Sequence, residues 1–157
     1  IVDGQAQGED PALPGLRCLR ALWTQGDGAV TAGIAETRVG LPRSGLPLLV
    51  LHGADDGLVP EAFSGGAYAR WAGPQRPSLA YWRIANAQHF DAFLGLPALA
   101  GRYVPLMPFG YRAMDAMWAH VAQGEALPDS ADIATTPRRV ENGALAPLRP
   151  ANLGTLP

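Results

Sequence analysis

The sequence predicts an α/β fold built on a parallel sheet, because short apolar segments and helix-like segments alternate along the middle of the chain. Two segments, 48–51 and 79–84, have the composition of strands and are bounded by turn signals. Each is followed by a helix-like segment, at 60–71 and at 112–123. Strand, helix, strand and helix with connections of this length are typical of a parallel βαβ unit.

The first strand and the helix after it have clear boundaries. Leu48–Leu51 is a continuous apolar run, which is the pattern of a strand buried on both faces of a sheet. The helix at 60–71 carries Pro60 in its first turn and ends before Gly73-Pro74. The pair Gly65-Gly66 weakens this helix.

The second strand is followed by a less regular region and then by the strongest helix pattern of the chain. The segment 94–102 predicts a short helix or an Ω-like excursion, and 103–110 predicts an apolar loop that contains Pro. In the helix at 112–123, apolar residues recur at i, i+3, i+4 and i+7, and this spacing predicts a single apolar face. That face consists of Met114, Met117, Trp118 and Val121.

The N-terminal part predicts helices rather than strands. Residues 1–15 have the composition of a loop, in which Pro11 and Pro14 stand. The segments 16–23 and 29–38 have helical character, with a break around Gly26-Asp27-Gly28.

The sheet predicted from this sequence is incomplete. From Gly124 onward Pro and Gly recur, so we divide the chain into part of an α/β domain at 1–123 and an extended, irregular tail at 124–157.

Two strands are too few for a stable parallel sheet, since both of its faces need to be covered. The chain also begins at Ile1 rather than Met. We therefore expect it to be a piece of a longer protein that supplies the missing strands.

Composition excludes several classes of function. The chain has 157 residues, of which 48% are hydrophobic and 17% charged, as in a folded domain. A net charge of −2 predicts no nucleic-acid or membrane partner, and no apolar run approaches the roughly 18 residues of a membrane span. The single cysteine, Cys18, has no metal-binding neighbours, and the sequence has no Gly-rich phosphate loop. We expect neither a metal nor a cofactor.

An acid and a histidine follow the two predicted strands. His52-Gly53-Ala54-Asp55-Asp56 comes after the first strand, and Asn86-Ala87-Gln88-His89 comes after the second. Parallel sheets place their ligand sites beyond the carboxyl ends of the strands, so the two groups should meet at one edge. A carboxylate that accepts a hydrogen bond from imidazole Nδ1–H allows the other ring nitrogen to act as a general base toward a serine. An acid before a histidine, after an earlier nucleophile, is the order of α/β-hydrolases.

Asp56 is the candidate acid and His89 the candidate base. Asp55 points away from its neighbour and is expected to cap the turn or the next helix. The alternative interpretation is that both aspartates are turn residues, as Asp often is. A lone loop histidine is also more often structural than catalytic, and only the position of His89 one strand beyond the acid favours catalysis.

The remaining histidines and one further acid have structural interpretations. His52 is expected to support the turn after the first strand, and His120 is expected to be solvated on its helix. Asp91 is interpreted either as a partner of the site or as a helix cap. None of the three is a candidate for catalysis.

No residue qualifies as the nucleophile. The sequence Gly-x-Ser-x-Gly is absent, and no serine follows a strand and leads into a helix, as a nucleophile elbow requires. This holds for Ser44, Ser64 and Ser78, and Cys18 lacks that setting as well.

Two blocks of sequence resemble the C-terminal part of bacterial D-(−)-3-hydroxybutyrate oligomer hydrolases. The first runs from Leu51 to Pro60, LHGADDGLVP, and is shared by many α/β-hydrolases. The second, AQHFDAFLGLP at 87–97 followed by RYVPL at 102–106, is far more particular to that family. The likeness extends from about Leu16 to Arg138.

The resemblance implies the C-terminal βαβα portion of an α/β-hydrolase fold and a serine esterase that cleaves 3-hydroxybutyrate oligomers to monomers. It assigns the acid to Asp56 and the base to His89, and it implies that the nucleophilic serine lies in an upstream part of the same protein. We therefore expect this chain alone to be inactive. The segment 103–109 is interpreted as a lining of the acyl pocket or as a packed core loop. The family's association with polymer breakdown implies a secreted or periplasmic enzyme.

Two alternatives stay open on the sequence alone. One is a tannase-like, feruloyl-esterase-like or oligopeptidase-type α/β-hydrolase, which shares the spacing of acid and histidine but not the block at 87–97. The other is a non-catalytic fragment that only packs against a partner.

Overall fold

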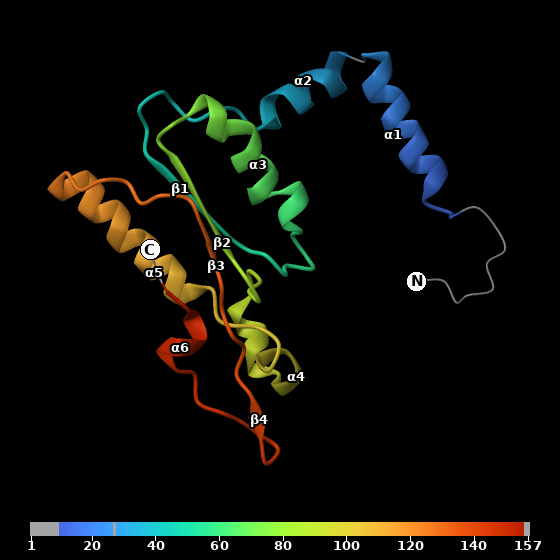
Figure 1. Cartoon of the computed structure of the whole chain (residues 1–157). Helices are drawn as coiled ribbons and strands as arrows, with labels where there is room; N and C mark the ends of the chain where they lie inside the picture. Colours follow the sequence, from blue (N-terminus) through green and yellow to red (C-terminus); the bar gives the residue numbers. More distant parts are fainter. Residues whose placement is uncertain (1–9, 27, 156–157) are drawn as a thin grey trace. The chain divides into compact units, whose positions relative to one another are not determined.

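The computed structural model describes residues 10–26 and 28–155, so most of the loop predicted at 1–15 lies outside the described residues. The chain forms two compact units, Ile1–Gly40 and Leu41–Pro157, which we describe separately (Figure 1). Within the described residues, no helix has the length and apolar character needed to cross a membrane.

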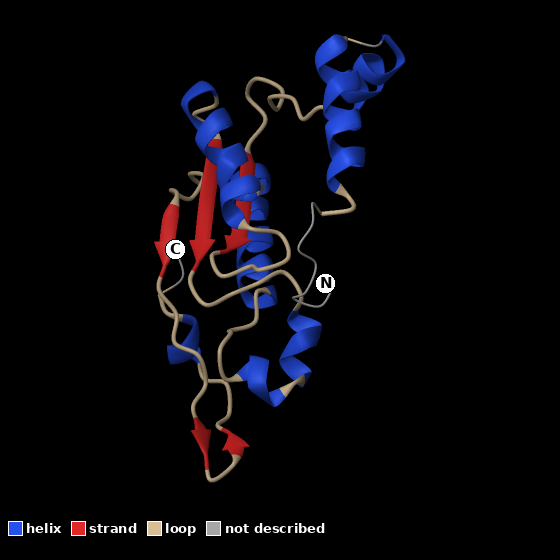
Figure 2. Ribbon diagram, turned by 90° about the vertical axis from the view of Figure 1, so that its right-hand side faces the viewer, coloured by secondary structure: helices blue, strands red, loops and turns tan. Residues whose placement is uncertain are grey.

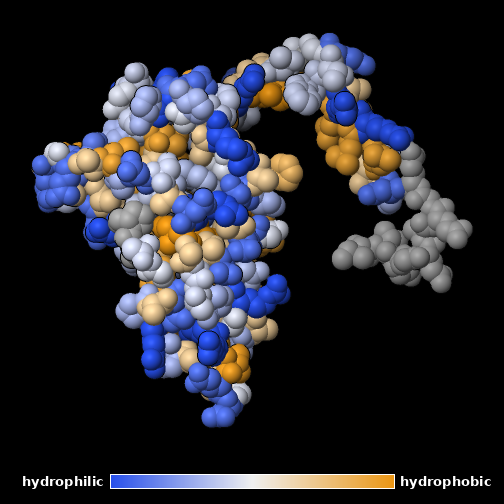
Figure 3. Space-filling view, in the orientation of Figure 1, coloured by the Kyte–Doolittle hydropathy of each residue, from blue (hydrophilic) through white to orange (hydrophobic). Residues whose placement is uncertain are grey.

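The first unit is a pair of helices, α1 (Leu13–Gln25) and α2 (Gly28–Thr37). Gly26 ends α1 in the left-handed conformation, with φ of 72°, and its N–H donates to carbonyls of the last turn. The predicted break between two helices is thus confirmed on either side of Asp27, which itself is not described. None of the described residues of the two helices is buried, and apolar side chains are exposed to solvent on α1 (Figure 3).

The second unit contains a three-stranded parallel sheet in the order β1 (Leu48–Gly53), β2 (Leu79–Ile84) and β3 (Ala131–Ile133) (Figure 2). Strand β1 pairs with β2 from Leu48 opposite Leu79 to Gly53 opposite Ile84. The predicted parallel pairing of the first two strands is therefore confirmed. The free edge of β1 pairs with no described residue.

Strand β3 corrects the prediction that 124–157 is an extended, irregular tail. Tyr81 N–H donates to Ser130 Oγ at 2.9 Å and Trp82 Nε1–H donates to the Asp129 carbonyl at 3.1 Å, which positions the tail beside β2. The same region forms an antiparallel pair, β4 (Val140–Glu141) and β5 (Ala144–Leu145), and a short helix, α6 (Pro150–Leu153). A strand of three residues is too short for a pattern of apolar alternation to reveal it.

Helices α3 (Gly65–Ala72) and α5 (Met107–Trp118) pack on the sheet. Because side chains alternate along a strand, Trp82 and Ile84 of β2 share one face, where they form the core with Phe109 and Ala113 of α5. Strand β1 is half-buried rather than buried on both faces as predicted, since it lies at the edge of the sheet.

The helix predicted at 60–71 is interrupted. A single turn, η1 (Glu61–Phe63), precedes α3, and Ser64 separates them with φ of −132° and ψ of −114°. Helix α3 begins with the pair Gly65-Gly66, at two positions where a Cβ atom would collide with neighbouring side chains. A Cβ at Gly65 would lie 2.8 Å from His52 Nδ1, and one at Gly66 would collide with the Glu61 carboxylate.

The helix predicted at 112–123 begins five residues earlier and is rotated from the predicted orientation. Helix α5 starts at Met107, inside the expected apolar loop, and a π-helical turn, η4 (Ala119–Gln123), follows Trp118. The buried residues are Phe109 and Ala113, so the predicted apolar face is not the side of the helix that is buried in this chain. Three of the four predicted residues belong to an exposed apolar series that runs along α5 into η4. We call it the α5 stripe: Met107, Tyr111, Met114, Trp118 and Val121.

The region between β2 and α5 contains the short helices that the segment 94–102 predicted. Of these, α4 (Pro97–Ala100) falls within the predicted range, whereas η3 (Asp91–Gly95) begins before it; η2 (Gly73–Gln75) extends α3.

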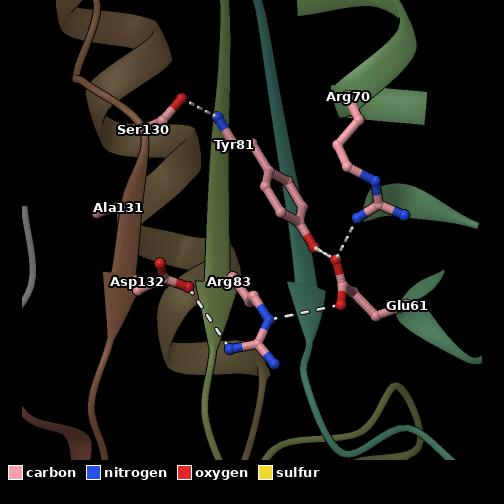
Figure 4. A pocket seen from close by; sticks show the side chains of 7 residues that line it. All are labelled: Glu61, Arg70, Tyr81, Arg83, Ser130, Ala131 and Asp132. Atoms are coloured by element: carbon pink, nitrogen blue, oxygen red, sulfur yellow. Dashed lines mark hydrogen bonds and ion pairs between the residues drawn. The ribbon is translucent and has the colours of Figure 1, made fainter. Parts of the chain in front are cut away.

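On the sheet face opposite the core, a charged cluster of Glu61, Arg70, Tyr81 and Arg83 joins η1 to the sheet (Figure 4). The Glu61 carboxylate accepts hydrogen bonds from Tyr81 at 3.1 Å and Arg70 at 3.3 Å, and it pairs with Arg83 at 3.5 Å. Burial opposes the charge on Glu61, but these donors outweigh it and hold the pKa of the carboxyl below its usual value. Burial and the adjacent carboxylate raise the pKa of Tyr81 to about 12. Since η1 directly follows the loop 54–60, the cluster fixes the end of that loop.

We expect Glu61→Gln to lower the free energy of unfolding at neutral pH by roughly 1–2 kcal/mol, a modest value because both arginines are exposed to water. A lowered pKa in the folded state stabilises the fold above the ordinary pKa of Glu, and this stabilisation disappears as pH falls through the lowered value. Chemical unfolding at several pH values should therefore show wild type and variant converging in acid. Glu125→Gln is the control, and a difference that stays constant with pH would contradict the expectation.

Candidate active site

Two loops at the carboxyl ends of β1 and β2 are joined to each other by hydrogen bonds. Ala54 N–H donates to the Ile84 carbonyl at 2.8 Å, and Asp55 N–H donates to the Ala87 carbonyl at 3.2 Å. The Asp55 carboxylate accepts from Asn86 N–H at 2.6 Å. Because the strands are parallel, the acid-bearing and histidine-bearing loops meet at one edge of the sheet, as the sequence predicted.

Asp56 and His89 form the centre of this edge. Oδ2 of Asp56 lies 2.5 Å from His89 Nδ1 and also accepts from His89 N–H at 3.0 Å. Its Oδ1 accepts from the N–H groups of Leu58 at 3.0 Å and Val59 at 2.9 Å. The carboxylate therefore binds both its own loop and the histidine loop, and Asp56 is only 5% exposed.

The electrostatics of Asp56 favour its charged form. Burial by itself raises the pKa of the carboxyl, but the hydrogen bonds from Val59, His89 and Leu58 together lower it below the usual range of Asp. An ionised carboxylate can only accept, so the proton in the short contact belongs to Nδ1 of His89. Neutral His89 then has its free electron pair on Nε2.

His89 exposes its other ring nitrogen. The side chain is 31% exposed, and Nε2 makes no hydrogen bond to any described residue. The ring lies against Phe90 at a tilt of 45°, with 3.9 Å between the ring centres. An imidazole that is oriented by a buried carboxylate and open at Nε2 can take a proton from a hydroxyl group placed beside it.

The other sequence candidates have structural roles, two of them different from the expected ones. Asp55 does not cap its own turn or the next helix but binds the loop after β2. His52 supports the turn as predicted, because its Nε2 lies 2.9 Å from the Val59 carbonyl oxygen. His120 is not simply solvated, since its Nδ1 lies 2.7 Å from the Glu125 carbonyl oxygen. Asp91 caps α5 by accepting from Leu106 and Met107 N–H.

Asn86 is a residue of this site that the sequence interpretation missed. It has φ of 53°, a left-handed conformation that Asn adopts more readily than most residues. Its side-chain amide donates to the Thr135 carbonyl and hydroxyl oxygens, and its carbonyl accepts from Val104 N–H at 2.7 Å. Asn86 thus fixes the histidine loop to two later segments. A polar residue directly after a strand was a sign of such a turn.

We expect Gly53→Ala to lower the free energy of unfolding by roughly 1–3 kcal/mol, the usual cost of overpacking. A Cβ at Gly53 would collide with the backbone carbonyl of Ala87, so the two loops would have to separate. Chemical unfolding measures the effect. Gly57→Ala in the same loop is the matched control, since a Cβ there meets no atom within 4 Å, and equal effects of the two variants would refute the explanation.

The described residues offer no metal site, and two of the serines that the sequence analysis considered are hydrogen-bonded to backbone carbonyls rather than to His89. The described residues contain no group of three His, Cys, Asp or Glu side chains that could hold a metal ion. Ser64 Oγ donates to the Pro60 carbonyl at 2.7 Å, and Ser78 Oγ donates to the Leu46 carbonyl at 3.0 Å.

Comparisons with known proteins agree with one another. A family model described as 3HB-oligomer hydrolase matches residues 2–157. A D-(-)-3-hydroxybutyrate oligomer hydrolase of Burkholderia lata is 36% identical over 155 residues, which are 97% of this chain and 22% of that protein. Proteins of the same name from Paracidovorax citrulli and Burkholderia cenocepacia are 41% and 37% identical, over 90% and 92% of this chain and 21% of each relative. The chain thus spans about a fifth of the length of these curated relatives. No solved structure matches it.

Proposed function

The chain belongs to the family of 3HB-oligomer hydrolases, and from this premise we propose that it carries the acid and the histidine of a serine-dependent ester hydrolase that acts on 3-hydroxybutyrate oligomers. The observation that supports this most is the pairing of buried Asp56 with His89 Nδ1, which leaves Nε2 open. A pair that only stabilised the fold would not need an open ring nitrogen.

In the proposed reaction, Nε2 of His89 takes the proton of a serine hydroxyl while the serine oxygen attacks the carbonyl carbon of the ester. Asp56 stabilises the imidazolium that forms and keeps the ring in the required orientation. When the tetrahedral intermediate collapses, His89 gives the proton to the leaving alkoxide, and an acyl-enzyme remains. Water, deprotonated by the same nitrogen, releases the acid and restores the serine.

The serine is proposed to lie in a longer polypeptide that completes an α/β-hydrolase sheet on the free edge of β1. Beside this edge, a groove of 410 Å³ is lined by Leu49 and Leu51 of β1 and by methionines of α5. The α5 stripe lies exposed on the same helix, and Trp118 is 68% exposed. An unpaired strand next to so much open apolar surface is costly in water unless another segment covers it.

The test is an assay of the full-length protein with linear dimers and trimers of 3-hydroxybutyrate. Release of the monomer is expected, with little turnover of galloyl esters, feruloyl esters or peptides. Those three substrates represent the other α/β-hydrolases that share the spacing of acid and histidine. Preferred turnover of any of them, or no hydrolysis at all, would overturn the proposal.

A further inference from the structure

A small pocket lies beside the Asp56–His89 pair, between the two loops that carry it. Its volume is 290 Å³, near the lower end of small-molecule sites, which is enough for a short acyl unit. The lining residues come from the acid loop, the histidine loop and the helices after it: Gly57, Leu58, Gln88, Phe93, Leu99 and Tyr103.

The lining of this pocket favours an uncharged part of a ligand. Leu58, Phe93 and Leu99 are apolar, and no charged side chain is among the described lining residues. Gln88 is buried, and its Nε2 and Oε1 each bind the backbone of Phe90. The acid itself, Asp56, is only 5% exposed and already accepts four hydrogen bonds.

Among the described lining residues, Tyr103 supplies a hydroxyl that is available to a ligand. Its hydroxyl makes no hydrogen bond to any described residue. Arg102 lies over its ring, 5.8 Å from the ring centre, and does not line the pocket. A phenol can donate to, or accept from, a neutral oxygen of a ligand.

The walls of the pocket are tied to the histidine loop. Leu99 lies in α4, and Tyr103 N–H donates to the Leu99 carbonyl at 2.9 Å. The next residue, Val104, donates to the Asn86 carbonyl, three residues before His89. The distance between the pocket and His89 is therefore held by backbone hydrogen bonds, as a site that positions a substrate for reaction requires.

We propose that this pocket binds the acyl-side unit of the substrate, the 3-hydroxyacyl group next to the ester bond that is cleaved. In a linear dimer the alcohol-side unit ends in a free carboxylate, which an apolar pocket without a cation would reject. The acyl-side unit is neutral and carries a methyl group and a hydroxyl. Leu58, Phe93 and Leu99 surround the methyl group, and Tyr103 bonds the hydroxyl. This inference rests on the proposed function.

Two synthetic dimers with a propyl group in place of one methyl group test the assignment in the full-length protein. One carries the propyl group on its acyl-side unit and the other on its alcohol-side unit. We expect Leu99→Ala to raise kcat/KM for the first dimer, relative to the all-methyl dimer, by about tenfold, the usual size of an effect of pocket volume. The second dimer should not gain. Leu58→Ala, at an exposed position where misfolding is not expected, should act in the same direction.

Leu96→Ala is the matched control, because Leu96 is exposed and precedes α4 without lining the pocket. An equal gain for both dimers, no gain in either variant, or the same gain in Leu96→Ala would overturn the assignment of the pocket. In those cases the proposed function would still stand if the wild-type enzyme cleaves the dimer and His89→Ala does not. A wild-type enzyme that cleaves no dimer would refute the proposed function, and the inference with it.

Discussion

Replacing His89 by alanine in the full-length protein is expected to lower kcat for oligomer hydrolysis by about 10⁶-fold, the size of loss known for the histidine of such a triad. Among the described groups that donate hydrogen bonds to the Asp56 carboxylate, only the His89 side chain has a second nitrogen that is open to a substrate or a serine. Without it the described site loses the imidazole that Asp56 orients and that takes the proton of the serine in the proposed reaction. Release of 3-hydroxybutyrate from the dimer, measured under saturating substrate, gives kcat directly.

His120→Ala is the control for this variant. His120 also lies in the second unit, but its Nδ1 is close to the Glu125 carbonyl oxygen rather than to a carboxylate. It should keep near-normal turnover. A His89→Ala enzyme that is folded and loses less than about tenfold in kcat would show that His89 is not the base, since general bases contribute about 10²–10⁴-fold even alone.

Asp56→Asn is expected to lower kcat by about 10⁴-fold while leaving the fold intact. An amide can keep the bonds from Leu58 and Val59 N–H through its oxygen, but it lacks the charge that stabilises the imidazolium. It can also donate to the ring, which stabilises the tautomer with the proton on Nε2. Turnover of the same dimer measures the effect.

Asp55→Asn is the matched substitution next to it. The Asp55 carboxylate accepts from Asn86 N–H, a bond that the amide oxygen can also accept, so kcat should change far less than in Asp56→Asn. If Asp55→Asn were the more harmful of the two, the assignment of the acid would have to move to Asp55.

The sequence predicted the relation between Asp56 and His89 because it depends on few features. Two strands of a parallel sheet necessarily end at one edge, and an acid and a histidine directly follow them. The backbone hydrogen bonds that hold the pair, such as those made by Asn86 and Asp55, were not predictable in the same way. They depend on the exact path of two loops, which no periodic pattern encodes.

The helices show a different limit of sequence reasoning. The apolar spacing in α5 identified a helix correctly but selected the wrong side, because Met107, Met114 and Trp118 form a stripe as regular as the one that contains Phe109 and Ala113. A helix with two apolar sides does not reveal which side faces its own core. Strand β3 escaped prediction because its pairing depends on contacts with β2 and not on its own composition.

Covalent labelling of the full-length protein with a fluorophosphonate probes the proposed triad itself, since this reagent reacts with a serine that a neighbouring histidine activates. Mass spectrometry locates the labelled serine. We expect one labelled serine outside this chain, with labelling abolished in His89→Ala and retained in His120→Ala. Labelling of a serine within this chain, or equal labelling of the His89→Ala protein, would contradict the claim that Asp56 and His89 complete a triad with a serine from the rest of the enzyme.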